Sequence, residues 1–460
     1  MTSNNIVRRS HALFAGVFLC ACSTDVVSIG EERTSQLLER GSRCAESTEI
    51  EGDVRVENQA DLDALAGCEQ IAGDLAIEIF ETTDLAPLGS LRVVGGTLEL
   101  GARPPAPIFD TLEEWEALRA EREARIDRMQ EIADAGWLRS LHGVEALEQV
   151  GALDVSDISA PDLRAFSSLR NVSAHYGGPS AGQLIIARAR ELLDLSGLEA
   201  LVGIRELWIT GNPALESLVG VRLPTSLESV RVGGNPRLAD LDPLRSIEDV
   251  EATFVLTDSA VRDLDALASL ENVLESVEIS DNPELVDASG LVTLSDTRSL
   301  TISGNAALTQ LPEFASLFTL TQLYIQDNAA LETFTLDSGG LALRELSLPD
   351  RLLPRSAELL AITGNDKLRS IALPNSFPVT SVLAIEGNPS LVSVDLGNLE
   401  RVTELLTIVE NAQLSQVQLG VLRNAGAVEV INNPRLETAA LAGVPTFQST
   451  FTGNADSPAP

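Results

Sequence analysis

The chain has 460 residues, of which 44% are hydrophobic but only 4% aromatic, so any core must be mainly aliphatic. The formal net charge of −36 argues against a nucleic-acid-binding surface, which needs clustered Lys and Arg to displace counterions. The chain has four cysteines and three histidines; two of the cysteines belong to the N-terminal segment described below, and the other two with three histidines do not supply a plausible zinc site, so we expect neither a metal nor a cofactor.

Residues 1–21 have the pattern of a secretory signal peptide. Arg8 and Arg9 supply positive charge, and residues 11–21 form an apolar run that is closed by small residues. This run is too short to cross a bilayer as a helix, so we expect the segment to be removed during export.

The end of that run, Leu19-Cys20-Ala21-Cys22, resembles the lipobox of bacterial lipoproteins. The resemblance implies cleavage before Cys22 and acylation of Cys22, and the alternative is an ordinary signal cut nearby. Ser23 at the next position implies sorting to the outer membrane, with the protein periplasmic or surface-exposed. Residues 22–43 are then expected to form a flexible linker.

Two cysteines remain once Cys20 leaves with the signal peptide and Cys22 takes a lipid. In an oxidising compartment the remaining pair, Cys44 and Cys68, is most simply a disulfide bond. All four cysteines are accounted for in this way.

Residues 102–137 break the repeating pattern of the chain and predict a helical insertion. Asp110 is placed to cap the helix, with Glu113 as its capping-box partner. One face is apolar and the other is almost entirely Glu, Arg and Asp. We expect the helix to pack across its own chain as a brace, and the alternative is that it binds a partner. The apolar stripe consists of Leu112, Trp115, Leu118, Ile126, Met129 and Ile132.

From Leu207 onward one phrase, φ-x-φ-x-x-N-x-x-L with φ usually aliphatic, recurs about every 23 residues. Alternation with a period of two predicts a short strand whose φ residues face inward. A longer gap between Asn328 and Asn365 indicates an extra loop. The Asn position is occupied by Asn212, Asn235, Asp258, Asn282, Asn305, Asn328, Asn365, Asn388, Asn411 and Asn433.

An inward Asn at the corner of each coil can bond to backbone groups of neighbouring coils, which would otherwise be buried without partners. We therefore expect the recurring Asn residues to form a ladder of buried side-chain amides. Asp258 can accept such bonds but cannot donate them, so its coil should be looser.

The segment Cys44–Leu100 carries I-x-G-x-V-x-V, L-x-x-L-x-G-C and I-x-G-D-L-x-I, and it resembles the opening of receptor L domains with their paired cysteines. The later units resemble leucine-rich repeats, although the Leu after the Asn comes one residue later. The resemblance implies a right-handed parallel β-helix of about 23-residue coils over residues 44–450. It divides the coils into a receptor L domain-like part (44–200) and a leucine-rich-repeat-like part (201–450), and we expect residues 451–460 to be a flexible tail.

The middle residue of φ-x-φ should point outward and form a row along the expected sheet. In this row we place Trp208, Arg231, Phe254, Glu278 and Tyr324 as ligand-binding candidates. Exposed aromatics and Arg on a regular face are typical of interfaces and glycan sites, and the alternative is cross-strand packing or cover by a loop. Later coils carry small residues in this row, so ligand contact should concentrate between Trp208 and Tyr324.

No H-E-x-x-H or calcium-loop motif occurs, and we predict no catalytic residues. The family resemblance implies a non-enzymatic lipoprotein, attached to the envelope membrane by lipid only, that binds a protein or glycan through its sheet face or acts as a scaffold. We expect a monomer. The alternative is a polysaccharide-active enzyme on a parallel β-helix. Such an enzyme needs carboxylates on adjacent coils, and the expected neighbours of Glu278 in the row, Phe254 and Thr301, carry no carboxylate.

Overall fold

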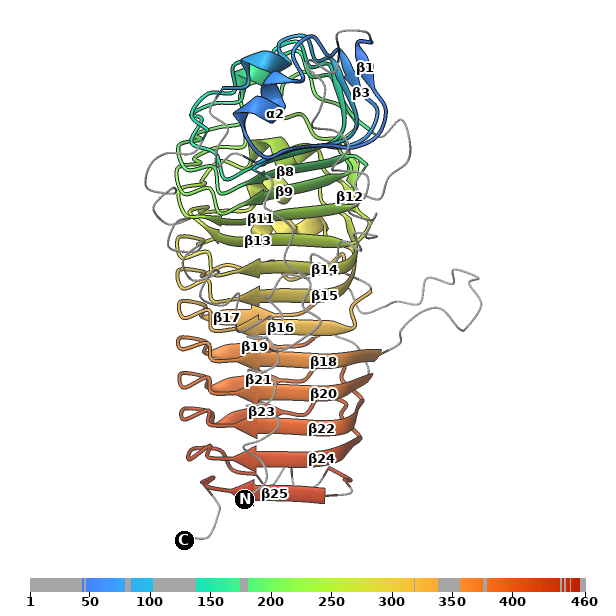
Figure 1. The fold of residues 1–460 in the computed structure, drawn as a ribbon. Coiled ribbons are helices and arrows are strands. Elements are labelled where there is room, and N and C mark those ends of the chain that lie inside the picture. The colour runs from blue at the N-terminus through green and yellow to red at the C-terminus, as the bar shows by residue number, and fades with distance from the viewer. Residues whose placement is uncertain are drawn as a thin grey trace, which may run out of the picture. The chain divides into compact units, whose positions relative to one another are not determined.

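The computed structural model describes residue 44 and residues 47–78, 84–101, 138–173, 181–317, 319–337, 356–374, 379–438, 441, 444–446 and 448–455. Over these residues the chain winds as a parallel β-solenoid with coils about 23 residues apart and very little helix (Figure 1). The predicted repeat solenoid is confirmed. The signal peptide, Cys22, the linker at 22–43 and the helical insertion at 102–137 lie outside the described residues.

One 21-stranded sheet runs along the coils, and its pairings are parallel. Each coil contributes a strand beside the equivalent strand of the next coil, so residues far apart in sequence become neighbours. The strands of this main sheet are β1 (Glu49–Ile50), β2 (Val54–Val56), β3 (Gln70–Ile71), β4 (Leu75–Ile77), β5 (Val93–Leu100), β6 (Gln149–Ser156), β7 (Asn171–Val172), β8 (Gln183–Ala187), β9 (Glu206–Thr210), β10 (Ser226–Leu227), β11 (Ser229–Asn235), β12 (Asp249–Val250), β13 (Thr253–Ser259), β14 (Asn272–Ser280), β15 (Asp296–Ser303), β16 (Gln322–Gln326), β18 (Ser356–Thr363), β20 (Val379–Glu386), β22 (Arg401–Val409), β24 (Asn424–Ile431) and β25 (Gln448–Thr452).

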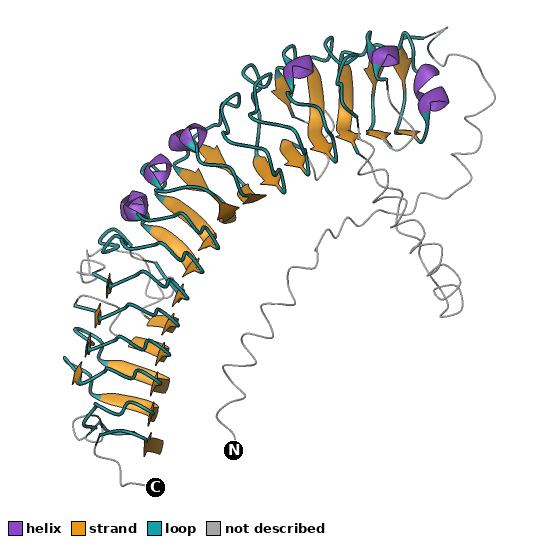
Figure 2. Cartoon of the chain, turned by 90° about the vertical axis from the view of Figure 1, so that its left-hand side faces the viewer, coloured by secondary structure: helices purple, strands orange, loops and turns teal. Residues whose placement is uncertain are grey.

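The other side of the coils changes character along the chain, as Figure 2 shows. Several earlier coils carry a short helix there, often preceded by an Asp whose side chain accepts a backbone N–H of the helix, as Asp240 does from Asp242 (3.0 Å). Later coils carry a four-stranded parallel sheet instead. The helices are α2 (Gln59–Asp63), η2 (Ala86–Leu88), η3 (Arg164–Phe166), η4 (Asp242–Ser246), η5 (Asp265–Leu267) and η6 (Ser289–Thr293), and the strands are β17 (Thr333–Thr335), β19 (Ser370–Ala372), β21 (Ser393–Asp395) and β23 (Gln416–Gln418).

The core is a continuous aliphatic column between these two sides. Alternate residues of the main strands point into it, as in Leu207 and Ile209 of β9, which are fully buried. Phe254 belongs to this column: it pairs with the inward Val230 and is also fully buried. Its expected place in the outward row was therefore wrong, and the outward residue of that coil is Val255.

The predicted ladder of buried amides is present at every Asn that the sequence singled out. In Asn282, for example, the backbone N–H and the side-chain Nδ2 both donate to Oδ1 of Asn305 (3.0 and 3.2 Å). The same Nδ2 donates to the carbonyl of Leu256 in the preceding coil (3.1 Å). Each such Asn except Asn235 thus ties three successive coils together, and all of them satisfy backbone groups that water cannot reach.

The ladder position of the coil between Asn235 and Asn282 is Ser259, not Asp258. Ser259 pairs with Asn235 in the sheet, is buried, and donates its backbone N–H to Oδ1 of Asn282 (3.1 Å). Asp258 is exposed and has a positive φ of 47°. The chain of side-chain amides is interrupted here, because Ser259 offers no amide to Asn235.

The residue just before each ladder position adopts a left-handed conformation, which turns the chain out of the strand. Gly is the residue that meets this demand without steric cost, yet several coils use other residues. The Gly positions are Gly211, Gly234, Gly304, Gly364, Gly387 and Gly453, and the others are Asp258, Asp281, Asp327, Glu410 and Asn432.

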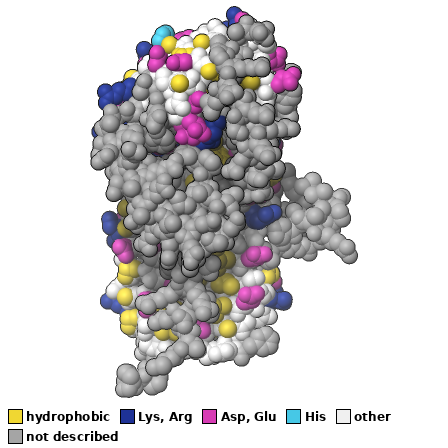
Figure 3. Space-filling model, viewed as in Figure 1, with side chains coloured by type: hydrophobic (Ala, Val, Ile, Leu, Met, Phe, Trp, Pro, Cys, Tyr) yellow, Lys and Arg dark blue, Asp and Glu magenta, His cyan; other side chains and the backbone are white. Residues whose placement is uncertain are grey.

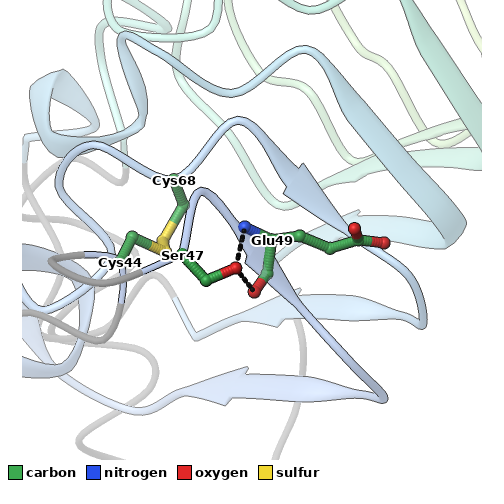
Figure 4. The surroundings of a disulfide bond; sticks show 4 residues. All are labelled: Cys44, Ser47, Glu49 and Cys68. Atoms are coloured by element: carbon green, nitrogen blue, oxygen red, sulfur yellow. Dashed lines mark hydrogen bonds between the residues drawn. A yellow bond between two sulfur atoms is a disulfide. The ribbon is translucent and has the colours of Figure 1, made fainter.

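The first and last described coils differ from the rest. At the start, Cys44 and Cys68 form the predicted disulfide bond (Figure 4), and Leu62 of α2 closes the core. At the end, β25 pairs with β24 and Asn454 adds a further ladder member, accepting from Nδ2 of Asn433 (3.3 Å). The solenoid therefore extends past the expected boundary at residue 450 into the segment that we had assigned to the tail.

Candidate functional site

The outward face of the main sheet carries a straight row formed by the central residue of each strand. Parallel pairing places Trp208 beside Arg231, Arg231 beside Val255, Val255 beside Glu278, and Thr301 beside Tyr324. Four of the five predicted site residues therefore share this row, and Phe254 is the exception. Neighbouring members are one inter-strand spacing apart, about 4.8 Å.

Trp208 and Arg231 form the only described cation–π contact, with the guanidinium carbon 5.4 Å from the centroid of the indole ring. One face of the ring is thus occupied by the neighbouring coil, which is the cross-strand packing that we had considered as the alternative. Arg231 itself is exposed, and no carboxylate of the described residues forms an ion pair with it. Its donors therefore face outward in a chain that is otherwise strongly acidic.

The indole Nε1 of Trp208 is buried and has no hydrogen-bond partner among the described residues. Leaving such a donor unpaired costs free energy, so the position of the ring is set by packing rather than by polar contacts. On the side away from Arg231, the neighbour of Trp208 is Ile185. The indole ring therefore lies between the apolar side chain of Ile185 on one side and the guanidinium of Arg231, which it positions, on the other.

Glu278 and Tyr324 occupy the row in less distinctive surroundings. Glu278 accepts a hydrogen bond from the Ser280 hydroxyl (2.8 Å). Tyr324 is half-buried between Thr301 and Ala361, and its burial raises the pKa of the phenol. The two residues lie in the same row as Arg231 but are not in contact with each other.

The row continues toward the N-terminus, where sequence reasoning did not follow it. Beyond Ile185 it contains Asp154 and then Glu99, which face each other from β6 and β5. These two carboxylates are separated in sequence by the insertion at 102–137, so the repeat period does not connect them. Their only sequence signal is the outward position in two separate φ-x-φ phrases.

The environment of this pair disfavours negative charge. Burial raises the pKa of Asp154 to about 6, opposed by a hydrogen bond from the Ser156 hydroxyl (2.5 Å). Burial also raises the pKa of Glu99, while the guanidinium of Arg55 lowers it. The negative charge of Glu99 adds to the raised pKa of Asp154, whereas Asp74 and Glu78 are the carboxylates that add to the raised pKa of Glu99.

An ion pair between a buried carboxylate and an exposed arginine lies at the strand end near Asp154. Asp157, 6% exposed, accepts two hydrogen bonds from the guanidinium of Arg188, at 2.6 and 2.8 Å. Both residues adopt positive φ at equivalent corners of successive coils. The forked geometry fixes Arg188 to its own chain, so the pair supports the corner rather than offering a free charge.

Metal sites, grooves and membrane spans of the described residues do not extend this row. No group of three or more His, Cys, Asp or Glu side chains there is suited to hold a metal ion. Two shallow grooves, one of about 480 Å³ beside Arg401 and one of about 380 Å³ beside His142, lie away from the Trp208–Arg231 pair. Across the same residues, no helix has the length and apolarity needed to cross a membrane.

The comparisons with known proteins add no relative to this picture. No family model matches the sequence, and no curated protein matches it.

Proposed function

We propose that this protein is a non-enzymatic recognition or scaffold module of the bacterial cell envelope, which binds a protein or glycan partner through the outward face of its main sheet. The observation that carries the proposal is the Trp208–Arg231 pair: an exposed guanidinium, held over an indole ring and not paired with any described carboxylate. Trp and Arg dominate the energetics of many interfaces. The resemblance to receptor L domains supports the same class of function by analogy.

The pair defines what such a partner should offer. Arg231 presents hydrogen-bond donors and positive charge, so a carboxylate or another strong acceptor of the partner fits it best. Trp208 contributes by fixing the guanidinium, since its own ring face is already covered. Replacing Trp208 should therefore weaken binding indirectly, by releasing Arg231.

The experiment compares retention of envelope components by the immobilised wild-type protein and by Arg231→Ala and Trp208→Ala variants, together with binding to a panel of glycans. Arg237→Ala is the matched control, because Arg237 is an exposed arginine in the turn that follows β11. We expect the two row variants to lose at least about tenfold in affinity for the retained partner, as for interface hot spots, while the control does not. Equal retention by all variants would remove this face from consideration.

We further propose that acylation of Cys22 attaches the mature chain to the outer membrane, as the lipobox resemblance implies. A Cys22→Ala variant should shift from the detergent-extracted membrane fraction to the soluble envelope fraction. Cys20→Ala is the control, because Cys20 precedes the expected cleavage point. Release of both variants to the same extent would argue against Cys22 as the lipid site.

A polysaccharide-active enzyme is the second candidate, and one observation favours it. Glu99 and Asp154 are directly opposed carboxylates on adjacent coils, and the pKa of Asp154 is about 6. A carboxyl group with a raised pKa can serve as a general acid, with the other carboxylate as base or nucleophile. Incubation with a glycan panel tests this candidate: turnover that Asp154→Asn abolishes, and that Glu275→Gln at an exposed site leaves intact, would replace the binding-only proposal.

A further inference from the structure

Four late strands of the main sheet are apolar on both of their faces. In β18, β20, β22 and β24 the inward residues are aliphatic, as in Leu360 and Ile362 of β18. The outward positions of the same strands hold further apolar residues that are paired side by side across the sheet. We call this outward surface the apolar face; Thr363, Glu386, Thr407 and Glu429 interrupt its rows, and its accessible apolar members are Leu359, Val382, Ala384, Leu405, Val409, Ala427 and Ile431.

The same outward row is polar in the preceding coils. Where Leu359 and Val382 stand, the earlier strands carry a continuous run of polar residues, and the row becomes polar again at Gln448 in β25. The earlier members are Glu206, Ser229, Thr253, Ser276, Ser299 and Gln322. A strand that reads as one hydrophobic run is typical of a sheet covered on both faces, whereas alternating strands have one face in water.

The apolar face reaches the surface of the molecule. Its larger members, including Leu405 and Ile431, are half-buried rather than enclosed. Figure 3 shows hydrophobic side chains at the surface over the lower strands of the sheet. A contiguous patch of this kind on a soluble chain marks an interaction site more often than scattered single residues do.

The charges around the apolar face restrict what can cover it. Glu386 and Glu429 lie in its outward rows, and Glu358 and Glu404 are exposed at its border, where the strands begin. Arg401 and Arg423 are exposed cations at that border, where they are outnumbered by these carboxylates. A second copy of this chain would bring the same carboxylates together in one interface, and the net charge of −36 adds to that repulsion.

From this arrangement we infer that the apolar face of β18–β24 binds a cationic amphipathic polypeptide segment. The segment would lay aliphatic side chains on Val382, Leu405 and their neighbours. Its Lys or Arg residues would face Glu386, Glu429 and the border carboxylates. This surface is separate from the Trp208–Arg231 pair, which presents a cation, so the two sites would select opposite charges.

The inference is tested with the full chain and three synthetic peptides of equal length: alternating Leu/Lys, alternating Ser/Lys and alternating Leu/Glu. We expect the Leu/Lys peptide to bind, and to bind less tightly as salt is raised. The Ser/Lys peptide measures attraction to the acidic chain as a whole and should bind at least about tenfold more weakly, because it buries no apolar surface. Equal affinity for Leu/Lys and Ser/Lys, or equal affinity for Leu/Lys and Leu/Glu, would overturn the inference.

A pair of matched variants places the binding on this surface. Val382→Ser should lower the affinity for Leu/Lys by about fivefold to tenfold, as loss of a buried aliphatic side chain predicts, while Val255→Ser, at an outward site between Arg231 and Glu278, should not. Glu429→Gln should reduce both the affinity and its salt dependence. An unchanged affinity in Val382→Ser overturns the assignment, and so does concentration-dependent dimerisation that Val382→Ser abolishes. Should Val382→Ser fail to fold, the peptide series on the wild-type chain decides.

Discussion

The Nδ2 of Asn282 donates to the Oδ1 of Asn305, 3.2 Å away in the next coil, while the Nδ2 of Asn305 reaches back to the carbonyl of Ile279 (2.9 Å). One side chain therefore accepts from one coil and donates to it as well. No water is available to either group, because both Asn residues are fully buried. Such an amide contributes more to stability than a surface hydrogen bond, because its removal leaves several buried donors and acceptors without a hydrogen-bond partner at once.

We accordingly expect Asn305→Ala to lower the free energy of unfolding by about 2–4 kcal/mol, because donors of Asn282 and the carbonyl of Ile279 lose their partner in a dry core. Asn454→Ala, at the last ladder member, serves as the comparison and should cost less, because Asn454 is buried less completely than Asn305 (7% against 0% exposed) and has a ladder neighbour on one side only. Urea unfolding followed by circular dichroism measures both. A cost for Asn305→Ala no larger than that for Asn454→Ala would contradict this account of the ladder.

The disulfide between Cys44 and Cys68 closes a loop over the first coil. Replacing both cysteines by Ser should lower stability by about 3 kcal/mol, through the greater freedom of the unfolded chain. Because coils contact only their neighbours, the loss should be concentrated near β1 to β4. Amide hydrogen exchange measures this loss of local stability. We expect faster exchange in these strands only, and faster exchange along the whole chain would contradict a local effect.

The burial of Asp154 predicts the direction in which the stability of the protein changes with pH. Its folded-state pKa of about 6 lies above the ordinary value of 3.8, so the folded state favours the protonated form. The stability linked to this group is fully present below pH 4 and is lost as the pH rises through 6, amounting to about 2–3 kcal/mol. Asp154→Asn removes this dependence and can still accept the bond from Ser156.

Urea midpoints at pH 4, 5, 6 and 7.5 check this prediction. The free-energy difference between Asp154→Asn and the wild type should shift in favour of the variant as the pH rises across this range. A difference that is constant with pH would mean that Asp154 is not held in an environment that disfavours its charge.

At the positions with positive φ before the ladder residues, two substitutions should have opposite effects on stability. At Gly304, φ is +67° and an added Cβ would lie 2.2 Å from Oδ1 of Asp281, so Gly304→Ala should destabilise the protein by about 1–3 kcal/mol. At Asp281, φ is +55°, so Asp281→Gly should be neutral or stabilise by up to about 1 kcal/mol. The double variant should recover part of the cost of Gly304→Ala, because the obstructing carboxylate is gone. Thermal unfolding of the three variants tests the coupling, and strict additivity would exclude the steric contact.

Sequence reasoning succeeded where the period was regular. The Asn spacing was enough to predict the stacked coils and the buried amides, because only a parallel stack brings residues 23 apart into contact. It failed at Phe254, where one extra residue shifts the phrase: both Asp258 and Ser259 are small and polar, and only the strand register shows that Ser259 is inward. The same limit hid Asn454, which follows a shortened coil.

The candidate site was only partly accessible to such reasoning. Outward positions could be read from the alternation, which placed Trp208 beside Arg231, but the packing of one on the other depends on side-chain geometry. The pairing of Glu99 with Asp154 could not be predicted, because residues 102–137 break the repeat period between their two strands. The apolar face of β18–β24 was not predicted. The prediction concerned the central outward row, in which those coils carry mostly small residues, whereas the aliphatic residues lie in the rows on either side of it.

Ser259 has a consequence for how the protein responds to force. On one side of it, Asn212 and Asn235 form a short amide pair, and on the other an unbroken run extends from Asn282 to Asn454. The coils of Asn235 and Ser259 meet without a ladder amide between them, so their cohesion depends on the strand hydrogen bonds, the apolar column and a few other side-chain contacts, such as the Ser229 and Thr253 hydroxyls (3.1 Å). Under tension, the coils that carry the ladder, from Asn212 to Asn454, should part from one another first at this seam.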